Sequence, residues 1–269
     1  RLPYAADPLV RWLGHHVAEG VEEVDAIGYR RVLPSGAIAG LRIEAGGVTL
    51  TTAVEDVRAI PDAVTRCRRL VDADADPGAV DEILGRDKLL AAMVRRRPGL
   101  RVPGSTDGFE LLVRTILAQQ VSLRAANTFA ARLAAAYGKP LDAPSGSLTT
   151  RFPTSDALAE AALDGVGLTT SRQTSVRAAA AAHASGELVL DPSADRDATR
   201  AQLLALPGVG PWTAEYVAMR ALGDPDAFPG SDLVLRRRVD PAHAERWRPW
   251  RSYAAMHIWS AHIEKEARP

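Results

Sequence analysis

The chain has 269 residues, of which 46% are hydrophobic and 25% charged, and its 33 Lys and Arg residues balance 33 Asp and Glu residues. This composition indicates a folded globular protein of about two domains, and the zero net charge argues against a protein that coats nucleic acid through bulk positive charge, though not against a local basic patch. No apolar run approaches the roughly 20 residues of a membrane-spanning helix and no secretory signal opens the chain, so we expect a cytoplasmic protein without membrane contacts.

The first hundred residues are expected to mix strands and helices. Gly46-Gly47 is typical of a hairpin turn between two strands. Alternating, β-branched residues predict strands over 27–33, 37–44 and 48–54. Helical patterns follow at 61–71, 78–84 and 86–97.

Cys67 is the only cysteine, so this chain has no internal disulfide and no cysteine-ligated iron–sulfur cluster. Neighbouring arginines favour the thiolate, whereas a lone cysteine is ordinarily a small core residue. The second interpretation predicts an inert thiol in a reducing compartment. The chain begins at Arg1 rather than Met, as expected for a piece of a longer protein.

From Thr106 onward the pattern is almost entirely helical, which makes the predicted fold class α+β. Asp107 is expected to cap the first of these helices and Ser122 the second. A Pro-, Gly- and Ser-rich loop is expected at 138–150. The predicted helices are 109–117, 123–137, 155–163, 171–185, 197–206, 211–222, 232–239 and 251–265. The change in composition near residue 100 divides the chain into an α+β domain, 1–100, and an all-helical region, 101–269.

A Pro-Gly-Val-Gly turn, 207–210, joins two of these helices. Asp197 is expected to cap the first helix, and Pro211 begins the second. Glycines permit a tight turn and close approach of another backbone, and N–H groups at a helix start bind phosphate. The segment 197–222 is therefore interpreted as a helix–hairpin–helix that grips a nucleic-acid backbone without reading bases. An ordinary helical hairpin and a non-catalytic DNA-binding element remain alternatives.

Asp232 follows this hairpin after a loop rich in Pro and Gly and opens the next predicted helix. Taken alone, an Asp in that place is a helix cap. Its position one helix and one loop after a phosphate grip makes it the candidate catalytic carboxylate.

These motifs together resemble the helix–hairpin–helix DNA glycosylases, and among them the DNA-3-methyladenine glycosylase II enzymes. The resemblance runs from Leu2-Pro3-Tyr4 nearly to the end of the chain. Its most specific block is Trp247-Arg248-Pro249-Trp250-Arg251-Ser252-Tyr253 with His257-Ile258-Trp259, and the other matching segments are 116–122, 206–214 and 228–232.

The resemblance implies a TATA-box-binding-protein-like N-terminal sheet, a helical region with a cleft, and hydrolytic excision of flipped-out alkylated bases. It implies Asp232 as the catalytic residue. The base pocket would take Trp212, Tyr216, Trp259, Leu233 and His15. The DNA contacts would be Gln120, Val121, Gly208, Val209, Gly210 and Thr213. A monovalent cation would be held by the main-chain carbonyls of Leu204, Leu206 and Val209.

Trp212 narrows the expected chemistry. Family members that also nick the strand carry Lys in this position, because an amine must form the Schiff base. The sequence therefore predicts a monofunctional glycosylase that needs no cofactor for catalysis and leaves an abasic site. We expect it to act as a monomer on damaged double-stranded DNA of a bacterial nucleoid.

Three residues depart from the family pattern. Gln120 stands where an apolar wedge is expected, His15 where an aromatic residue lines the pocket, and Leu233 where a hydroxylated aromatic follows the Asp. The range of excised bases is therefore open. A glycosylase for deaminated or oxidised bases and a non-catalytic helix–hairpin–helix DNA-binding protein are the alternatives.

Overall fold

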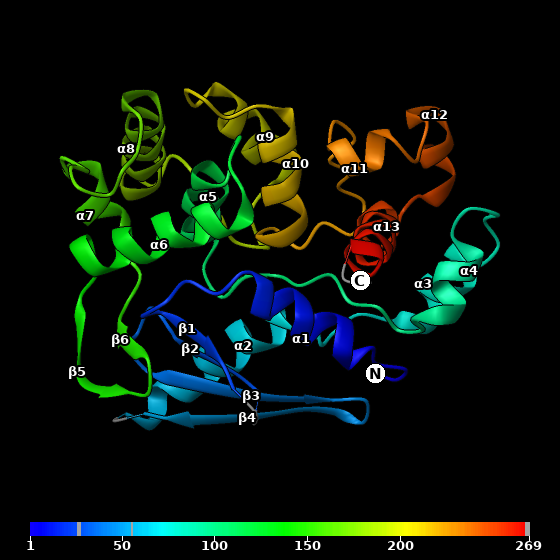
Figure 1. The fold of residues 1–269 in the computed structure, drawn as a ribbon, viewed down its shortest axis with the longest axis horizontal. Coiled ribbons are helices and arrows are strands. Elements are labelled where there is room, and N and C mark those ends of the chain that lie inside the picture. Colours follow the sequence, from blue (N-terminus) through cyan, green and yellow to red (C-terminus); the bar gives the residue numbers. More distant parts are fainter. Residues whose placement is uncertain (26–27, 55, 267–269) are drawn as a thin grey trace.

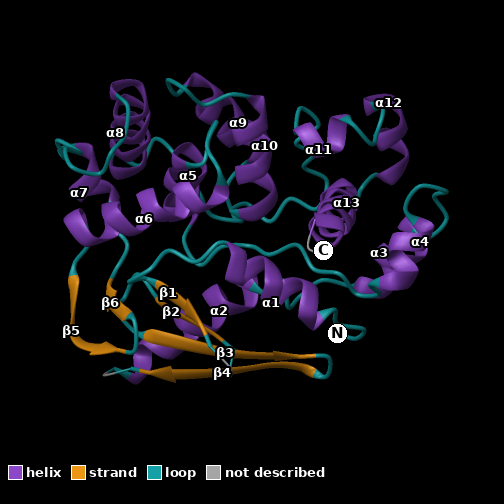
Figure 2. Cartoon of the chain, in the orientation of Figure 1, coloured by secondary structure: helices purple, strands orange, loops and turns teal. Residues whose placement is uncertain are grey.

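A four-stranded antiparallel sheet forms one side of the molecule in the computed structural model, which describes residues 1–25, 28–54 and 56–266 (Figures 1 and 2). Its strands follow chain order: β1 (Glu22–Val24), β2 (Tyr29–Val32), β3 (Ile38–Glu44) and β4 (Gly47–Ala53). The predicted hairpin at Gly46-Gly47 is confirmed, since Glu44 pairs with Gly47. The short strand β1 was not predicted, and Ile27, the expected start of β2, lies outside the described residues.

Two helices, α1 (Ala6–His15) and α2 (Ile60–Leu70), pack with the sheet around the smaller of the two hydrophobic cores that the described residues form. Leu9 and Leu13 of α1 belong to this core, whereas Trp12 belongs to the larger, helical core. Helix α1 therefore lies between the two parts of the protein, as Figure 1 shows. Cys67 is buried on α2, and burial raises the pKa of its thiol to about 11, so the predicted inert thiol is confirmed.

The larger core is helical. Val80 and Leu84 of α3 and Val94 of α4 belong to it, although both helices precede residue 100. No helix within the described ranges is long and apolar enough to cross a membrane. Short 3-10 turns lie at Val57–Ala59 and Glu245–Trp247, and the remaining helices are α3 (Pro77–Leu84), α4 (Ala91–Arg96), α5 (Gly108–Leu117), α6 (Leu123–Tyr137), α7 (Ser155–Ala159), α8 (Thr170–Ala184), α9 (Arg196–Ala205), α10 (Pro211–Arg220), α11 (Leu233–Arg236), α12 (Pro241–Ala244) and α13 (Arg251–Glu266).

Two local expectations are wrong. The segment 138–150 is not a plain loop but contains a second, two-stranded sheet of β5 (Pro140–Ser145) and β6 (Leu148–Thr150). Arg30 of β2 donates to the Ser145 hydroxyl at 2.7 Å, so this hairpin gains partners on the main sheet that a local reading cannot reveal. Helix α9 is capped by Asp195, which accepts from the backbone N–H of Asp197 and so places Asp197 inside the first turn.

Two acidic and two basic side chains connect the sheet to α5. Arg31 of β2 donates to Glu22 at 3.1 Å and to Glu110 of α5 at 2.5 Å, and Arg114 donates to Glu22 at 2.8 Å and to Glu110 at 2.9 Å. Burial alone would raise the pKa of Glu22, but Arg114 and Arg31 lower it to about 2. This buried network fixes the sheet against the helices.

Candidate active site

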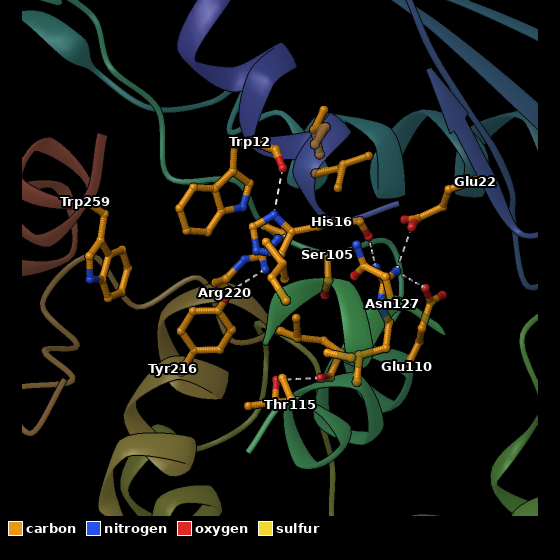
Figure 3. A pocket seen from close by; sticks show the side chains of 18 of the residues that line it. Trp12, His16, Glu22, Ser105, Glu110, Thr115, Asn127, Tyr216, Arg220 and Trp259 are labelled. Atoms are coloured by element: carbon orange, nitrogen blue, oxygen red, sulfur yellow. Dashed lines mark hydrogen bonds and ion pairs between the residues drawn. The ribbon is translucent and has the colours of Figure 1, made fainter. Parts of the chain in front are cut away.

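A cavity of about 660 Å³ opens where α1, α5, α10 and α13 meet (Figure 3). Its wall is aromatic near Asp232 and becomes polar toward the sheet, where the network of Glu22, Arg31, Glu110 and Arg114 forms part of the lining. The cavity thus brings together residues from both cores. Its aromatic, basic and acidic side chains include Trp12, His16, Trp212, Tyr216, Arg220, Asp232 and Trp259.

Asp232 caps the N-terminus of α11 as predicted, and four N–H donors converge on its carboxylate. Oδ1 accepts from the backbone N–H of Val234 at 2.9 Å and of Leu235 at 3.1 Å. It also accepts from the indole N–H of Trp259 at 3.0 Å, and Oδ2 accepts from that of Trp212 at 3.2 Å. Among the described residues no Lys, Arg or His forms an ion pair with Asp232. Neutral donors therefore orient this carboxylate without cancelling its charge.

The expected pocket aromatics lie around this carboxylate. Trp212 stacks on Tyr216 with 5.0 Å between ring centroids and an interplanar angle of 12°. Tyr216 lies 6.2 Å from Trp259, which in turn stacks on Trp12 at 6.0 Å. Trp212, Tyr216 and Trp259 thus share the cavity, and Leu233, a residue that is 69% exposed, lies at its edge.

The hairpin before α10 leaves its backbone accessible. Gly208 is exposed and has a φ of +76°, and a Cβ there would meet the Ser175 hydroxyl oxygen at 2.3 Å. Gly210 caps α10 with nothing within 4 Å of its Cβ position. Pro211 begins the helix, so the orphan N–H groups of its first turn lie beside this open glycine. The arrangement fits an anion-binding helix start.

Gln119 connects this hairpin to the α5–α6 turn. Its side-chain amide donates to the Gly208 carbonyl at 2.9 Å and to the Thr213 hydroxyl at 3.1 Å. The next residue, Gln120, is exposed and adopts a positive φ of 56°. A left-handed conformation at a non-glycine residue is costly and is often retained at functional sites. Gln120 therefore stands out at the tip of the turn, with Val121 lining the cavity behind it.

Other predicted residues occupy different surroundings. Thr213 is buried, with its hydroxyl engaged by Gln119, and the side chain of Val209 belongs to the core. His15 is exposed and lines a separate hollow with Arg124 and Arg132, whereas its neighbour His16 lines the aromatic cavity. Sequence reasoning missed His16, because only the rotation of the unpredicted helix α1 decides which of two adjacent histidines faces inward.

The carbonyls expected to hold a cation lie at the end of α9. Leu204 is in the last turn of the helix, where carbonyls have no intrahelical partner. The Leu206 carbonyl accepts from the Val209 N–H at 3.2 Å, which leaves it a further lone pair. Carbonyl oxygens at the negative end of a helix dipole suit a monovalent cation. In the described ranges no group of three or more His, Cys, Asp or Glu side chains is placed to hold a metal ion.

An exposed glycine hairpin between two helices, next to a carboxylate in an aromatic cavity, defines the chain as a helix–hairpin–helix protein. Two family models agree: the AlkA N-terminal domain matches residues 1–107, and the HhH-GPD superfamily base excision DNA repair protein matches residues 113–260. The chain belongs to this superfamily and, within it, to the DNA-3-methyladenine glycosylase 2 family.

Two curated relatives show the extent of the match. The chain is 35% identical to DNA-3-methyladenine glycosylase 2 of Escherichia coli, over 96% of this chain and 94% of that protein. It is 46% identical to a probable bifunctional transcriptional activator/DNA repair enzyme AlkA of Mycobacterium tuberculosis, over 97% of this chain and 55% of the relative. The chain therefore spans about half the length of the mycobacterial relative.

Solved structures share the fold. A 3-methyladenine DNA-glycosylase from Archaeoglobus fulgidus aligns over 97% of this chain and 96% of its own, with a TM-score of 0.80 and 19% identity. A Clostridium acetobutylicum 8-oxoguanine glycosylase/lyase in complex with double-stranded DNA aligns over 96% and 91%, with a TM-score of 0.76 and 18% identity. The same fold thus serves proteins whose names differ in the base they remove.

Proposed function

We propose that this protein is a monofunctional DNA glycosylase that flips alkylated bases out of double-stranded DNA and hydrolyses their N-glycosidic bond, leaving an abasic site. The observation that carries the proposal is the Asp232 carboxylate held between the indoles of Trp212 and Trp259 in the aromatic cavity. Kinship with DNA-3-methyladenine glycosylase 2 supports alkylated purines as the substrate class.

The hydrogen bonds to Asp232 suggest which oxygen acts. Among the described residues, Oδ1 accepts three N–H groups and is saturated, while Oδ2 accepts only the Trp212 indole N–H. A carboxylate oxygen has room for about two hydrogen bonds, so Oδ2 keeps a lone pair for the reaction. It would stabilise the positive charge that develops on the sugar as the base leaves, or orient the attacking water. A base that is already cationic needs no strong general acid to depart.

Aromatic faces would bind the flipped base before the bond breaks. A methylated cationic purine on the rings of Trp212 and Tyr216 gains roughly 0.5–2 kcal/mol of cation–π attraction. Extruding a base costs a few kcal/mol, and less where alkylation has weakened pairing. Gln120, exposed at the tip of the α5–α6 turn, would enter the vacated space in the duplex, with Val121 beside it.

The hairpin would hold the DNA backbone. The amides of Gly208 and Gly210 would bind one phosphate, while the Val209 N–H closes the turn on the Leu206 carbonyl and the buried Thr213 holds Gln119 against the hairpin. A monovalent cation on the Leu204, Leu206 and Val209 carbonyls would stiffen the turn and attract the same strand. We further propose that the protein works as a monomer and needs no iron–sulfur cluster.

The absence of strand cleavage follows from Trp212. This position contributes an indole N–H to Asp232, and an indole cannot form the Schiff base that a lyase requires.

Base release from alkylated duplex DNA tests the proposal. The protein should release free methylated purines and leave strands that break only after alkali. Release of no base by protein that still binds DNA would favour the non-catalytic alternative. Release of only hypoxanthine or 8-oxoguanine would favour the glycosylases for deaminated or oxidised bases, and strand breaks before alkali would contradict the monofunctional assignment.

A further inference from the structure

The end of the cavity opposite Asp232 carries polar groups that the reaction does not use. Trp212, Tyr216 and Arg220 stand at positions i, i+4 and i+8 of α10 and therefore line one face of the helix. Eight residues of helix rise about 12 Å, so this row leads from the carboxylate at Trp212 to the guanidinium of Arg220. A bicyclic base whose sugar lies at Asp232 would have its far edge at Arg220.

Arg220 is a buried cation with unused donors. Its side chain donates to the carbonyls of Pro103 and Gly104 at 2.7 and 3.1 Å and to the Tyr216 hydroxyl at 2.8 Å. A guanidinium has five N–H donors, of which the described residues accept three, so two remain. It packs 5.8 Å from the Trp12 ring centroid and 5.3 Å from that of Tyr216, and no carboxylate among the described residues forms an ion pair with it. A buried charge of this kind calls for a ligand atom with partial negative charge.

His16 supplies the complementary acceptor. Its Nδ1 lies 2.7 Å from the Trp12 carbonyl oxygen, which can only accept, so Nδ1 carries the proton. Burial, followed by the charge of Arg220, lowers the pKa of His16 to about 3, so the ring is neutral and Nε2 bears a lone pair. The ring stacks on Trp12 at 4.6 Å and lines the cavity, as Figure 3 shows. Its Nε2 has no hydrogen-bond partner among the described residues.

We propose that Arg220 and His16 read the far edge of the flipped base and select a lactam, that is, a ring C=O beside a ring N–H. This inference rests on the proposed glycosylase function. With the sugar at Asp232, O6 of a 6-oxopurine accepts from Arg220 while its N1–H donates to Nε2 of His16. An adenine-type edge in the same place sets its N6 amino donors against the donors of Arg220 and its N1 lone pair against that of His16.

The same orientation suits a methylated guanine. Its positive five-membered ring carries the sugar and therefore lies near the Asp232 carboxylate and the Trp212 face. Its neutral lactam lies at the cationic end of the row. The two ends of the cavity thus match the charge distribution of 7-methylguanine, and the Arg220 end matches neutral hypoxanthine.

The experiment compares two products released from one sample of methylated duplex DNA. The ratio of 7-methylguanine to 3-methyladenine, measured at limited turnover, is independent of the fraction of folded enzyme. His16→Leu removes the acceptor and should lower this ratio about tenfold, the effect of leaving one buried hydrogen bond unmade. His16→Gln restores an acceptor and should recover most of the ratio, and Arg220→Lys, which loses the planar donor pair, should lower it.

A duplex with a single hypoxanthine provides the second readout, and its excision by His16→Leu should fall by a similar factor. An unchanged product ratio in His16→Leu overturns the proposal, as does an equal fall for all three bases, which would indicate a merely structural role. Failure of the unmodified protein to release either methylated purine would instead overturn the proposed function itself.

Discussion

Two sets of carboxylates line the same cavity and are held in opposite ways. Glu22 and Glu110 each accept from both Arg31 and Arg114, and this network carries no net charge. Within the part of the chain that the structure describes, Asp232 accepts only from neutral N–H groups. A carboxylate paired with arginine can join two parts of a fold but has little charge left for a sugar cation. Neutral donors fix the geometry of Asp232 and leave its charge available to the reaction.

Glu22→Gln should lower the stability of the protein and leave its activity nearly unchanged, because Glu22 belongs to the arginine-paired carboxylates. The change removes the negative charge between Arg31 and Arg114 in a buried setting, and stranding a buried charge typically costs about 3–5 kcal/mol. We therefore expect a large fall in the free energy of unfolding, measured by urea denaturation. The rate of base release per folded molecule should change little, and a loss of activity without loss of stability would contradict the structural role.

Asp232→Asn should lower the activity of the protein and leave its stability nearly unchanged. An amide carries no negative charge with which to stabilise the developing sugar cation, and its NH₂ group, which replaces one oxygen, cannot accept the indole N–H that this oxygen accepts. We expect single-turnover base release to fall roughly 100- to 1,000-fold, with DNA affinity and thermal stability close to those of the unmodified protein. An Asn variant as active as the unmodified protein would contradict the assignment of Asp232 as the catalytic residue.

The sequence predicts some parts of the cavity and not others. The hairpin turn and Asp232 as a helix cap lie within single local motifs, so spacing and residue type locate them, whereas only the resemblance to the family implied that Trp212, Tyr216 and Trp259 surround Asp232. The identity of His16 as the cavity histidine, and its meeting with Arg220, depend on α1 packing across two cores. No local pattern carries that information, since the partners are some 200 residues apart in the chain.

The β5–β6 hairpin illustrates the same limit. Its Pro, Gly and Ser residues are typical of a loop, yet the Arg30–Ser145 bond and the bonds from Ser147 to Glu23 hold it in strand form against the main sheet. Tertiary contacts override composition there. The change in composition near residue 100 likewise gives no sign that α3 and α4, which precede it, pack with the helical core.

Asp72 extends the comparison to a fourth carboxylate. Its Oδ2 accepts from the Val102 N–H at 3.1 Å and the Tyr253 hydroxyl at 2.9 Å, and burial raises its pKa to about 6. Because the folded state then binds the proton more tightly than the unfolded chain, this group stabilises the fold below pH 4. That contribution is lost as the pH rises to 6, a change of about 3 kcal/mol.

Asp72→Asn isolates this effect, because Asn also tolerates the positive φ of 50° found at this position. The variant should gain stability relative to the unmodified protein between pH 4 and pH 6 in urea titrations. His16 and His257, whose burial lowers their pKa to about 3, oppose this trend in both proteins and cancel in the difference. A difference that does not vary with pH would show that Asp72 keeps its ordinary pKa.

Trp259→Phe gives the smallest expected effect and the sharpest test of how Asp232 is held. Phenylalanine keeps an aromatic face against Trp12 but removes the indole N–H that Oδ1 accepts at 3.0 Å. One net hydrogen bond is worth about 1 kcal/mol, so single-turnover release should fall about fivefold. Trp250→Phe is the matched control, since Trp250 packs edge-on against Tyr253 and lies outside the cavity lining. If both variants lose activity equally, the indole of Trp259 acts through packing, and the backbone amides of Val234 and Leu235 with Trp212 suffice to orient the carboxylate.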